Sequence, residues 1–244
     1  MTDRRTHRGP GPQDLALFAP GALGALRAAV AELSWLLSHG YRDASALKLV
    51  GDRHALTQRQ RVAVGRCACS DAALARRAVS RLSPEALHGR GVVVDGFNCL
   101  ITLETALSGG LLLLGRDGCT RDLGSVHGSY RAVEETERAI SLVGEWLTGR
   151  GASRVCWLLD RPVSNSGRLR ARLLEQAAAQ AWPWTVELLA NPDRTLAASS
   201  DVVASADSWV LDRCSAWVDL TGEVVARCCP EAWRPALVAT GGSS

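Results

Sequence analysis

The sequence predicts an α/β domain with a mainly parallel sheet, preceded by a small all-α domain. From residue 91 onward, short β-branched runs alternate with helical periodicity, which is typical of parallel strands joined by helical crossovers. Residues 14–90 show helical periodicity instead. Charge divides at the same place, because residues 1–90 carry 14 Lys and Arg against 7 Asp and Glu, whereas residues 91–244 carry 14 against 18. We expect a disordered leader (1–13), a basic helical domain (14–90), an α/β domain (91–236) and a flexible tail (237–244).

Composition excludes several classes of protein. The chain of 244 residues is 47% hydrophobic and 22% charged, which is sufficient for a folded core. Its apolar runs, Leu111–Leu114 among them, are far short of the ~20 residues of a membrane span, and the polar N-terminus lacks an apolar signal core. The eight cysteines contain no Cys-x-x-Cys pair, so reduced, buried thiols are favoured over zinc ligands. We expect a cytoplasmic protein with no membrane association.

The helical domain is predicted from apolar spacing and capping signals. Apolar residues at three-and-four spacing predict a helix over 23–37, which His39-Gly40 ends. Thr57 and Gln60 form a capping box, so another helix should begin at Gln58. The expected helices are 23–37, 44–50 (ended by Gly51), 58–69, 71–82 and a short last one opened by Ser83-Pro84-Glu85.

The arginines of this domain suggest a nucleic-acid partner. The two helices flanking Gly51–His54 could form a helix-turn-helix, with phosphates facing Arg53, Arg59, Arg61 and Arg66. A small bundle with solvated arginines is the alternative. The net charge of +7 over residues 1–90 favours phosphate contact, and sequence-specific base reading is unsupported.

The α/β domain is predicted to hold five strands in a compact three-layer sandwich. The strands are expected at 92–94, 155–159, 185–189, 202–205 and near 217–220, and the helices at 130–147, 168–181 and 208–213. Residues 95–98 are expected to form a loop. The segment 101–114 is ambiguous, because its Ser108-Gly109-Gly110 break fits either a helix followed by a strand or a hairpin.

Three of these strands end in an acid, at Asp95, Asp160 and Asp207. The carboxyl ends of parallel strands meet at one edge of a sheet, so we expect the three carboxylates to converge. Oxygen ligands are those that Mg²⁺ or Mn²⁺ prefers, and such a cation can activate water and neutralise charge on a phosphodiester. Asp201 or Glu104 is expected to complete the metal site. Taken alone, Asp201, and Asp193 in the predicted Asn191-Pro192-Asp193 turn, would each suit a turn or cap.

A phosphate seat is predicted before the helix at 168–181. Ser164, Ser166 and Gly167 precede that helix, whose N-terminus favours anions, and Arg116 lies in a charged loop. This seat would also suit a phosphotransferase or phosphatase. Against those activities, Asp95 has no second acid two residues on, and the chain has no Gly-x-x-x-x-Gly-Lys-Ser/Thr loop.

Two short motifs carry a resemblance to known nucleases. Val94–Leu100 (VDGFNCL) is similar to the opening strand and loop of PIN-like and NYN nucleases, and Val203–Ser208 (VASADS) resembles their later strand with its acid. The resemblance implies a PIN-like α/β/α sandwich and Mg²⁺- or Mn²⁺-dependent RNA cleavage. It also implies that Asp95 and Asp207 bind the metal directly, and that Asn98 orients the loop or a bound water.

The whole arrangement resembles an uncharacterised prokaryotic two-domain family of the domain-of-unknown-function 434 type. Gly40-Tyr41, Leu49–Arg53 and Leu56–Arg61 match the helical motifs of that family, and the resemblance covers roughly residues 20–230. It implies no established activity.

We therefore expect a metal-dependent ribonuclease of PIN/NYN-like type, with Asp95, Asn98, Asp160 and Asp207 at its catalytic centre. RNA is favoured over DNA as the partner. The alternative is a non-catalytic nucleic-acid-binding or regulatory protein with a degenerate PIN-like domain. The sequence leaves homo-oligomerisation and protein partners open.

Overall fold

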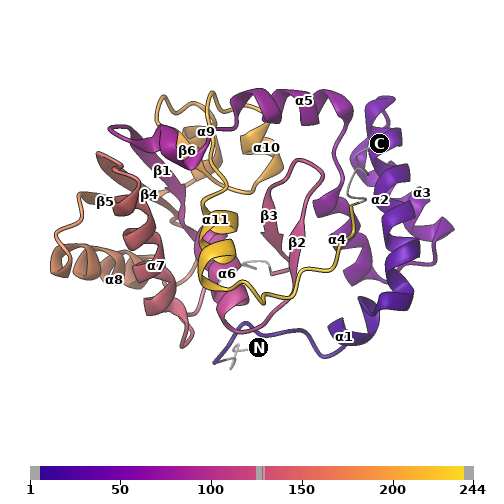
Figure 1. Ribbon diagram of the computed structural model, residues 1–244, viewed down its shortest axis with the longest axis horizontal. Helices are drawn as coiled ribbons and strands as arrows, with labels where there is room; N and C mark the ends of the chain where they lie inside the picture. Colours follow the sequence, from indigo (N-terminus) through magenta and orange to yellow (C-terminus); the bar gives the residue numbers. More distant parts are fainter. Residues whose placement is uncertain (1–5, 125–127, 129, 239–244) are drawn as a thin grey trace.

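A helical region and an α/β region lie side by side in the computed structural model, which describes residues 6–124, 128 and 130–238 (Figure 1). Within these residues, no helix has both the length and the apolar character needed to cross a membrane. The helical region comprises α1 (Asp14–Leu17), η1 (Pro20–Ala22), α2 (Leu23–Ser38), α3 (Asp43–Arg53), α4 (Gln58–Cys67), α5 (Asp71–Ser80) and η2 (Pro84–Leu87).

The predicted capping box at the start of α4 is present. The Thr57 side chain accepts from the Gln60 backbone N–H, and the Gln60 side chain accepts from the Thr57 backbone N–H at 3.0 Å. The expected stop at Gly51 is wrong, because α3 continues to Arg53. A Cβ at Gly51 would lie only 2.4 Å from Arg61 Nη1, so this glycine serves close packing rather than helix termination.

A four-stranded parallel sheet forms the centre of the α/β region. Its order is β5-β4-β1-β6, and every neighbouring pair is parallel. The strands are β1 (Gly91–Asp95), β4 (Arg154–Asp160), β5 (Trp184–Leu189) and β6 (Val202–Ala204). The helices are α6 (Gly96–Leu107), α7 (Thr136–Gly149), α8 (Ser166–Ala179), α9 (Pro192–Ala197), α10 (Ser208–Leu211) and α11 (Leu220–Cys228).

Helices cover both faces of this sheet. Side chains alternate along a strand, so Val92 and Val94 of β1 pack into a core shared with α6, α7, α8 and α11. Val93 points to the other face, where it packs with Leu196 of α9 and Val210 of α10. The predicted α/β class and three-layer arrangement are therefore present. The sheet has its acids at one edge because all four strands run the same way.

A two-stranded hairpin connects the two regions. Strands β2 (Leu112–Leu114) and β3 (Thr120–Asp122) pair antiparallel, apart from the main sheet. Leu111 and Leu113 are fully buried in the core formed by α2, α3 and α4. The ambiguous segment 101–114 thus contains the end of α6 and then β2, and β2 completes the core of the helical region.

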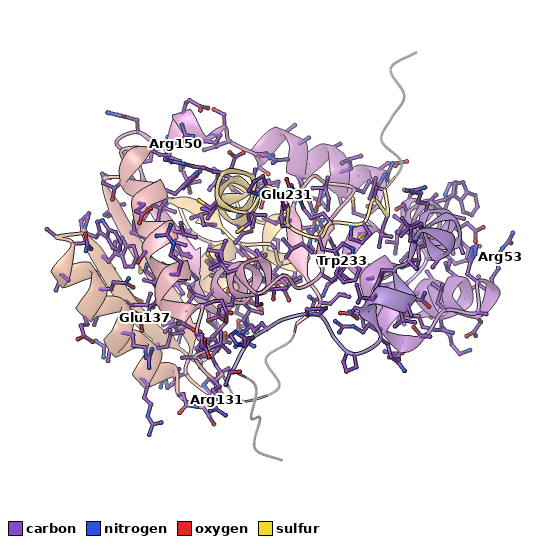
Figure 2. The ribbon with its side chains drawn as sticks, turned by 60° about the horizontal axis from the view of Figure 1, so that its bottom comes forward. Arg53, Arg131, Glu137, Arg150, Glu231 and Trp233 are labelled. Carbon is purple, nitrogen blue, oxygen red and sulfur yellow. The ribbon has the colours of Figure 1, made fainter. Side chains whose placement is uncertain are left out.

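Both terminal segments also cross between the regions, which corrects two predicted boundaries. Residues 6–13 of the expected leader are held in place, since His7 Nδ1 contacts Glu135 Oε1 at 2.6 Å and Arg8 pairs with Glu104. Leu237, the first residue of the expected tail, is buried in the helical core, and Figure 2 shows Trp233 between the two regions. Residues 1–5 and 239–244 lie outside the described residues.

Two further expectations are wrong. Residues 96–98 open α6 and do not form a loop. Trp217 makes only isolated bridges with Arg81 and Val203, so it begins no fifth strand of the sheet. The chain turns there into α11, because the Asp219 carboxylate accepts from the Gly222 N–H at 3.1 Å and caps that helix.

Candidate active site

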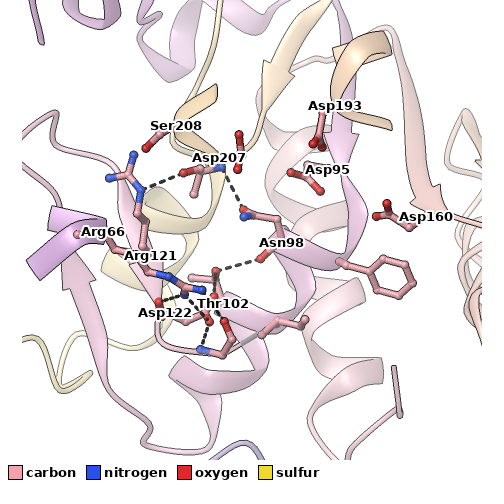
Figure 3. Close-up of a pocket in the computed structure, with 15 residues that line it drawn as sticks. Arg66, Asp95, Asn98, Thr102, Arg121, Asp122, Asp160, Asp193, Asp207 and Ser208 are labelled. Atoms are coloured by element: carbon pink, nitrogen blue, oxygen red, sulfur yellow. Dashed lines mark hydrogen bonds and ion pairs between the residues drawn. The ribbon is translucent and has the colours of Figure 1, made fainter. Parts of the chain in front are cut away.

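A pocket of about 390 Å³ opens at the carboxyl edge of the sheet (Figure 3). On the side of the sheet, four carboxylates from four different elements line it: Asp95, Asp160, Asp193 and Asp207. The wall on the side of the helical region is formed by Arg66, Thr102, Arg121 and Asp122. The structure therefore brings the three predicted strand-end acids to one pocket and adds a fourth.

Asp95 is buried at the end of β1. The next residue must be small, because a Cβ on Gly96 would lie 2.4 Å from Leu159 Cδ2 and 3.0 Å from the Leu158 carbonyl oxygen. Burial raises the pKa of Asp95 to about 7; the Ser205 hydrogen bond opposes this rise, and the charges of the other three acids add to it. A carboxylate in this state favours either a proton or a cation.

The loop after β6 is fixed against Asp95 by side-chain hydrogen bonds. The Ser205 hydroxyl donates to Asp95 Oδ2 at 2.7 Å. Asn98 Oδ1 accepts from the Ala206 N–H at 3.0 Å, so Asn98 holds this loop. Asp207 Oδ1 accepts from the Val210 N–H at 3.0 Å and caps α10.

Asp160 is partly buried, whereas Asp193 is exposed and only partly desolvated. Burial raises the pKa of Asp160 at the end of β4. Desolvation, followed by the charges of Asp207 and Asp160, raises the pKa of Asp193 in the first turn of α9. The sequence interpretation missed Asp193 because Asn191-Pro192-Asp193 was assigned to a turn. The signal was available, since this acid follows β5 as the other acids follow their strands.

The opposite wall joins the hairpin to α4. The Thr102 hydroxyl donates to Asp122 Oδ2 at 2.7 Å, and Arg66 Nη2 donates to the Gly124 carbonyl oxygen at 2.7 Å. Arg121 is buried and donates from Nε to the Ala206 carbonyl oxygen at 2.9 Å. Sequence reasoning missed Thr102, Arg121 and Asp122, because no local pattern shows that this hairpin returns to the sheet edge.

The predicted phosphate-binding arginines have partners within the protein. Nearest N–O distances are 3.4 Å for Arg53 and Glu32, 2.8 Å for Arg61 and Asp52, and 2.6 Å for Arg116 and Asp71. Arg59 is paired with the buried Asp14, Nη2 to Oδ2 2.7 Å. Of the predicted set, only Arg66 lines the acidic pocket among the described residues.

Glu104 and Asp201, two of the predicted metal ligands, lie outside this pocket. Glu104 is two turns further along α6, where it accepts from the hydroxyls of Tyr130 at 2.5 Å and Thr136 at 2.6 Å; burial raises its pKa. Asp201 precedes β6 and pairs with Arg154 at 2.6 Å, at the opposite edge of the sheet. Glu104 is carried away from Asp95 along α6, and Asp201 lies at the start of β6, not at its end.

The predicted phosphate seat also lies apart. Ser164, Ser166 and Gly167 do not line the acidic pocket. Ser166 is buried at the start of α8, and Asn165 Nδ2 donates to the Tyr130 carbonyl oxygen at 2.8 Å, which closes the loop against a neighbouring segment. The structure thus gives this loop a packing role.

The possible metal ligands of the pocket are aspartate oxygens, which suit a hard cation. Within the described ranges, no three His, Cys, Asp or Glu side chains form a group that could hold a metal ion. An all-protein cage is therefore not preformed. Mg²⁺ usually keeps several waters and binds through one or two carboxylates, and that mode fits a pocket of separate aspartates.

Comparisons with known proteins place the chain in a family. Residues 84–223 match the domain of unknown function DUF5616, and residues 25–79 match the protein of unknown function DUF434. The uncharacterized protein MJ0935 of Methanocaldococcus jannaschii is 31% identical over 198 residues, which is 80% of this chain and 93% of that protein. No solved structure gives a significant match. The chain therefore belongs to the two-domain family in which a DUF434 region precedes a DUF5616 domain.

Proposed function

We propose that this protein is a Mg²⁺- or Mn²⁺-dependent nuclease of PIN/NYN-like type that cleaves RNA. The observation that carries the proposal is the meeting of four carboxylates, from the ends of β1 and β4, from α9 and from the loop after β6, in one pocket. Clustered carboxylates at the carboxyl edge of a parallel sheet are suited to a divalent cation. The likeness of residues 94–100 to PIN-like and NYN nucleases supports RNA as the substrate.

The residues of the pocket divide the chemistry between them. Asp95 and Asp207 would hold the cation, which when bound supplies charge neutralisation at the phosphodiester and a more acidic water. Asp160, which is partly buried, and Asp193, which is exposed, both have raised pKa values, so either carboxylate can accept a proton from an attacking water. Arg66 on the opposite wall offers a guanidinium that attracts the phosphate.

Asn98 and Ser205 fix the end of β1 and the loop after β6 relative to each other. Asn98 Oδ1 holds the Ala206 N–H, and Ser205 bridges Asp95 and the Asp207 backbone. Neither side chain needs to change its bonds during the reaction. Their contribution is preorganisation of the carboxylates.

The test compares Asp95→Asn with Asp201→Asn, which alters an acid at the opposite sheet edge. With Mn²⁺ and a single-stranded oligoribonucleotide, we expect Asp95→Asn to lower the cleavage rate by at least ~100-fold, the low end of a lost acid–base or metal group. Asp201→Asn should cleave at the wild-type rate. In thermal denaturation, Mn²⁺ should stabilise the wild type and Asp201→Asn but not Asp95→Asn.

A wild-type protein that neither cleaves RNA nor gains stability from Mn²⁺ would overturn the proposal. The alternative, a non-catalytic nucleic-acid-binding or regulatory protein, would then replace it. Cleavage that survives in Asp95→Asn would also reject this pocket as the centre of the reaction.

A further inference from the structure

A second, larger groove adjoins the acidic pocket. Residues 6–13, here called the strap, run from the α/β region to the start of α1 along the bottom of Figure 1. The groove beside them has a volume of about 940 Å³ and is lined by the strap, α4, α6 and the segments flanking the hairpin. Ile101 and Gly124 line both this groove and the acidic pocket, so the two cavities are neighbours.

Two ion pairs give the groove the opposite polarity to the acidic pocket. Arg8 pairs with Glu104, and Arg59 pairs with Asp14. In both pairs the carboxylate side chain is 0% exposed, whereas the guanidinium side chains are 21% and 39% exposed. Both arginines line the groove, Glu104 does not, and Asp14 lines it with a side chain that is 0% exposed, so each pair offers mainly its cation to the cavity.

Apart from His7 and the unexposed Asp14, the rest of the lining is apolar or uncharged. Leu111, Leu123 and Ile101 line the groove together with Thr105 and the Gly9–Pro12 stretch of the strap. A ligand that alternates flat, weakly polar groups with anionic ones would match both the apolar surface and the arginines. A single-stranded nucleic acid has this alternation of bases and phosphates.

We propose that this groove binds the single-stranded segment that continues from the phosphodiester held in the acidic pocket. The proposal rests on the proposed nuclease function and adds a binding track to it. The volume lies in the range of ~300–1,000 Å³ typical of ligand sites, which accommodates a short single strand. The strap borders one side of this space, and we expect the track to bind single strands more tightly than a duplex.

The first experiment measures binding without cleavage. Fluorescence anisotropy with labelled oligoribonucleotides of increasing length is recorded in Ca²⁺, for the wild type and for Thr105→Trp, which fills the groove. Thr148→Trp, an exposed position on α7, is the matched control. We expect affinity to rise with length for the wild type and the control, and to stop rising in Thr105→Trp.

The second experiment removes one ion pair without leaving a lone buried charge. Asp14→Asn combined with Arg59→Gln should weaken single-strand binding and lower the slope of log K against log salt by ~0.7, the value for one lost phosphate contact. Asp52→Asn combined with Arg61→Gln neutralises a pair between α3 and α4 that lies outside the groove, and it should leave the slope unchanged.

The outcomes separate the groove from the nuclease. Wild-type length dependence in Thr105→Trp, an unchanged salt slope in the Asp14/Arg59 double variant, or equal affinity for duplex and single strand would each overturn the groove proposal. If the groove variants weaken binding but the wild type never cleaves, the track stands and the nuclease proposal fails. If the wild type cleaves and the groove variants bind normally, the nuclease stands and the track fails.

Discussion

The Ser205 hydroxyl donates a hydrogen bond to the buried Asp95 carboxylate, Oγ to Oδ2 2.7 Å. The same Oγ accepts from the Asp207 N–H at 3.0 Å. One hydroxyl therefore links the ends of β1 and β6. It also lowers the pKa of Asp95 against the effect of burial, so it supports the ionised form that a cation needs.

Ser205→Ala should lower the free energy of unfolding by ~1–3 kcal/mol, because the substitution leaves the Asp95 carboxylate and the Asp207 N–H without this partner. The pKa of Asp95 should rise further. Chemical denaturation and carboxyl NMR titration measure the two effects. Ser199→Ala, which removes an equivalent bond to the Asp201 N–H at the opposite sheet edge, should leave the titration of Asp95 unaltered. An unshifted Asp95 in Ser205→Ala would contradict this account.

Without a divalent cation, the wild type should lose stability as pH rises from about 4 to about 7. The folded pKa of Asp95, about 7, lies above its ordinary value of 3.8, so the native state binds the proton more tightly than the unfolded state in this window. Asp95→Asn cannot ionise, so its free energy of unfolding should fall less over the same range. Urea denaturation at several pH values in a chelator measures the difference. Parallel profiles for the two proteins would contradict the raised pKa.

Arg77→Met should destabilise the protein by ~3–5 kcal/mol, because it removes one of the two arginines that compensate the buried Asp117 carboxylate. Arg77 Nη1 donates to Asp117 Oδ2 at 2.6 Å, and Arg121 donates to the same oxygen at 2.7 Å. Although burial raises it, the two arginines hold the pKa of Asp117 well below its usual range. Lys48→Met breaks an exposed pair with Asp52 and should change stability little in chemical denaturation. If both substitutions lowered the free energy of unfolding equally, burial of the Arg77 ion pair would not explain its contribution to stability.

Glu104→Gln should loosen the strap. The substitution removes the charge that pairs with Arg8 but keeps an oxygen for the Tyr130 and Thr136 hydroxyls. Trypsin should therefore cut after Arg8 faster in the variant than in the wild type, as followed by mass spectrometry of native protein. Glu85→Gln, which alters an exposed pair with Arg150, is the control. Equal rates would mean that other contacts hold the strap.

The gathering of acids at one edge of the sheet was predictable from sequence, because each strand and the acid that follows it are adjacent in the chain. Asp95, Asp160 and Asp207 each end a β-branched or apolar run, and parallel strands place such ends together. Asp193 was missed because a proline turn separates it from β5. Glu104 was assigned to the site by its nearness to Asp95 in sequence, but the helix that begins at Gly96 carries it away from the pocket.

The long-range parts of the site were not predictable in this way. Arg121 and Asp122 lie on a hairpin that packs against the helical region. The sequence pattern of residues 108–124 does not indicate that packing. The arginines of the helical region were interpreted from net charge alone. Net charge does not show that Arg59, Arg61 and Arg66 each contact an acid of the same chain.

Leu111 and Leu113, together with Leu237, pack into the core of the helical region. The helical region and the α/β region should therefore fold and unfold together. A fragment ending near residue 90 would lack these side chains and would expose the surface of α2 and α4 that they cover. We therefore expect heat or denaturant to melt both parts in one transition. Evolution could not readily exchange the helical segment for another module, because the replacement would have to accept the same three leucines.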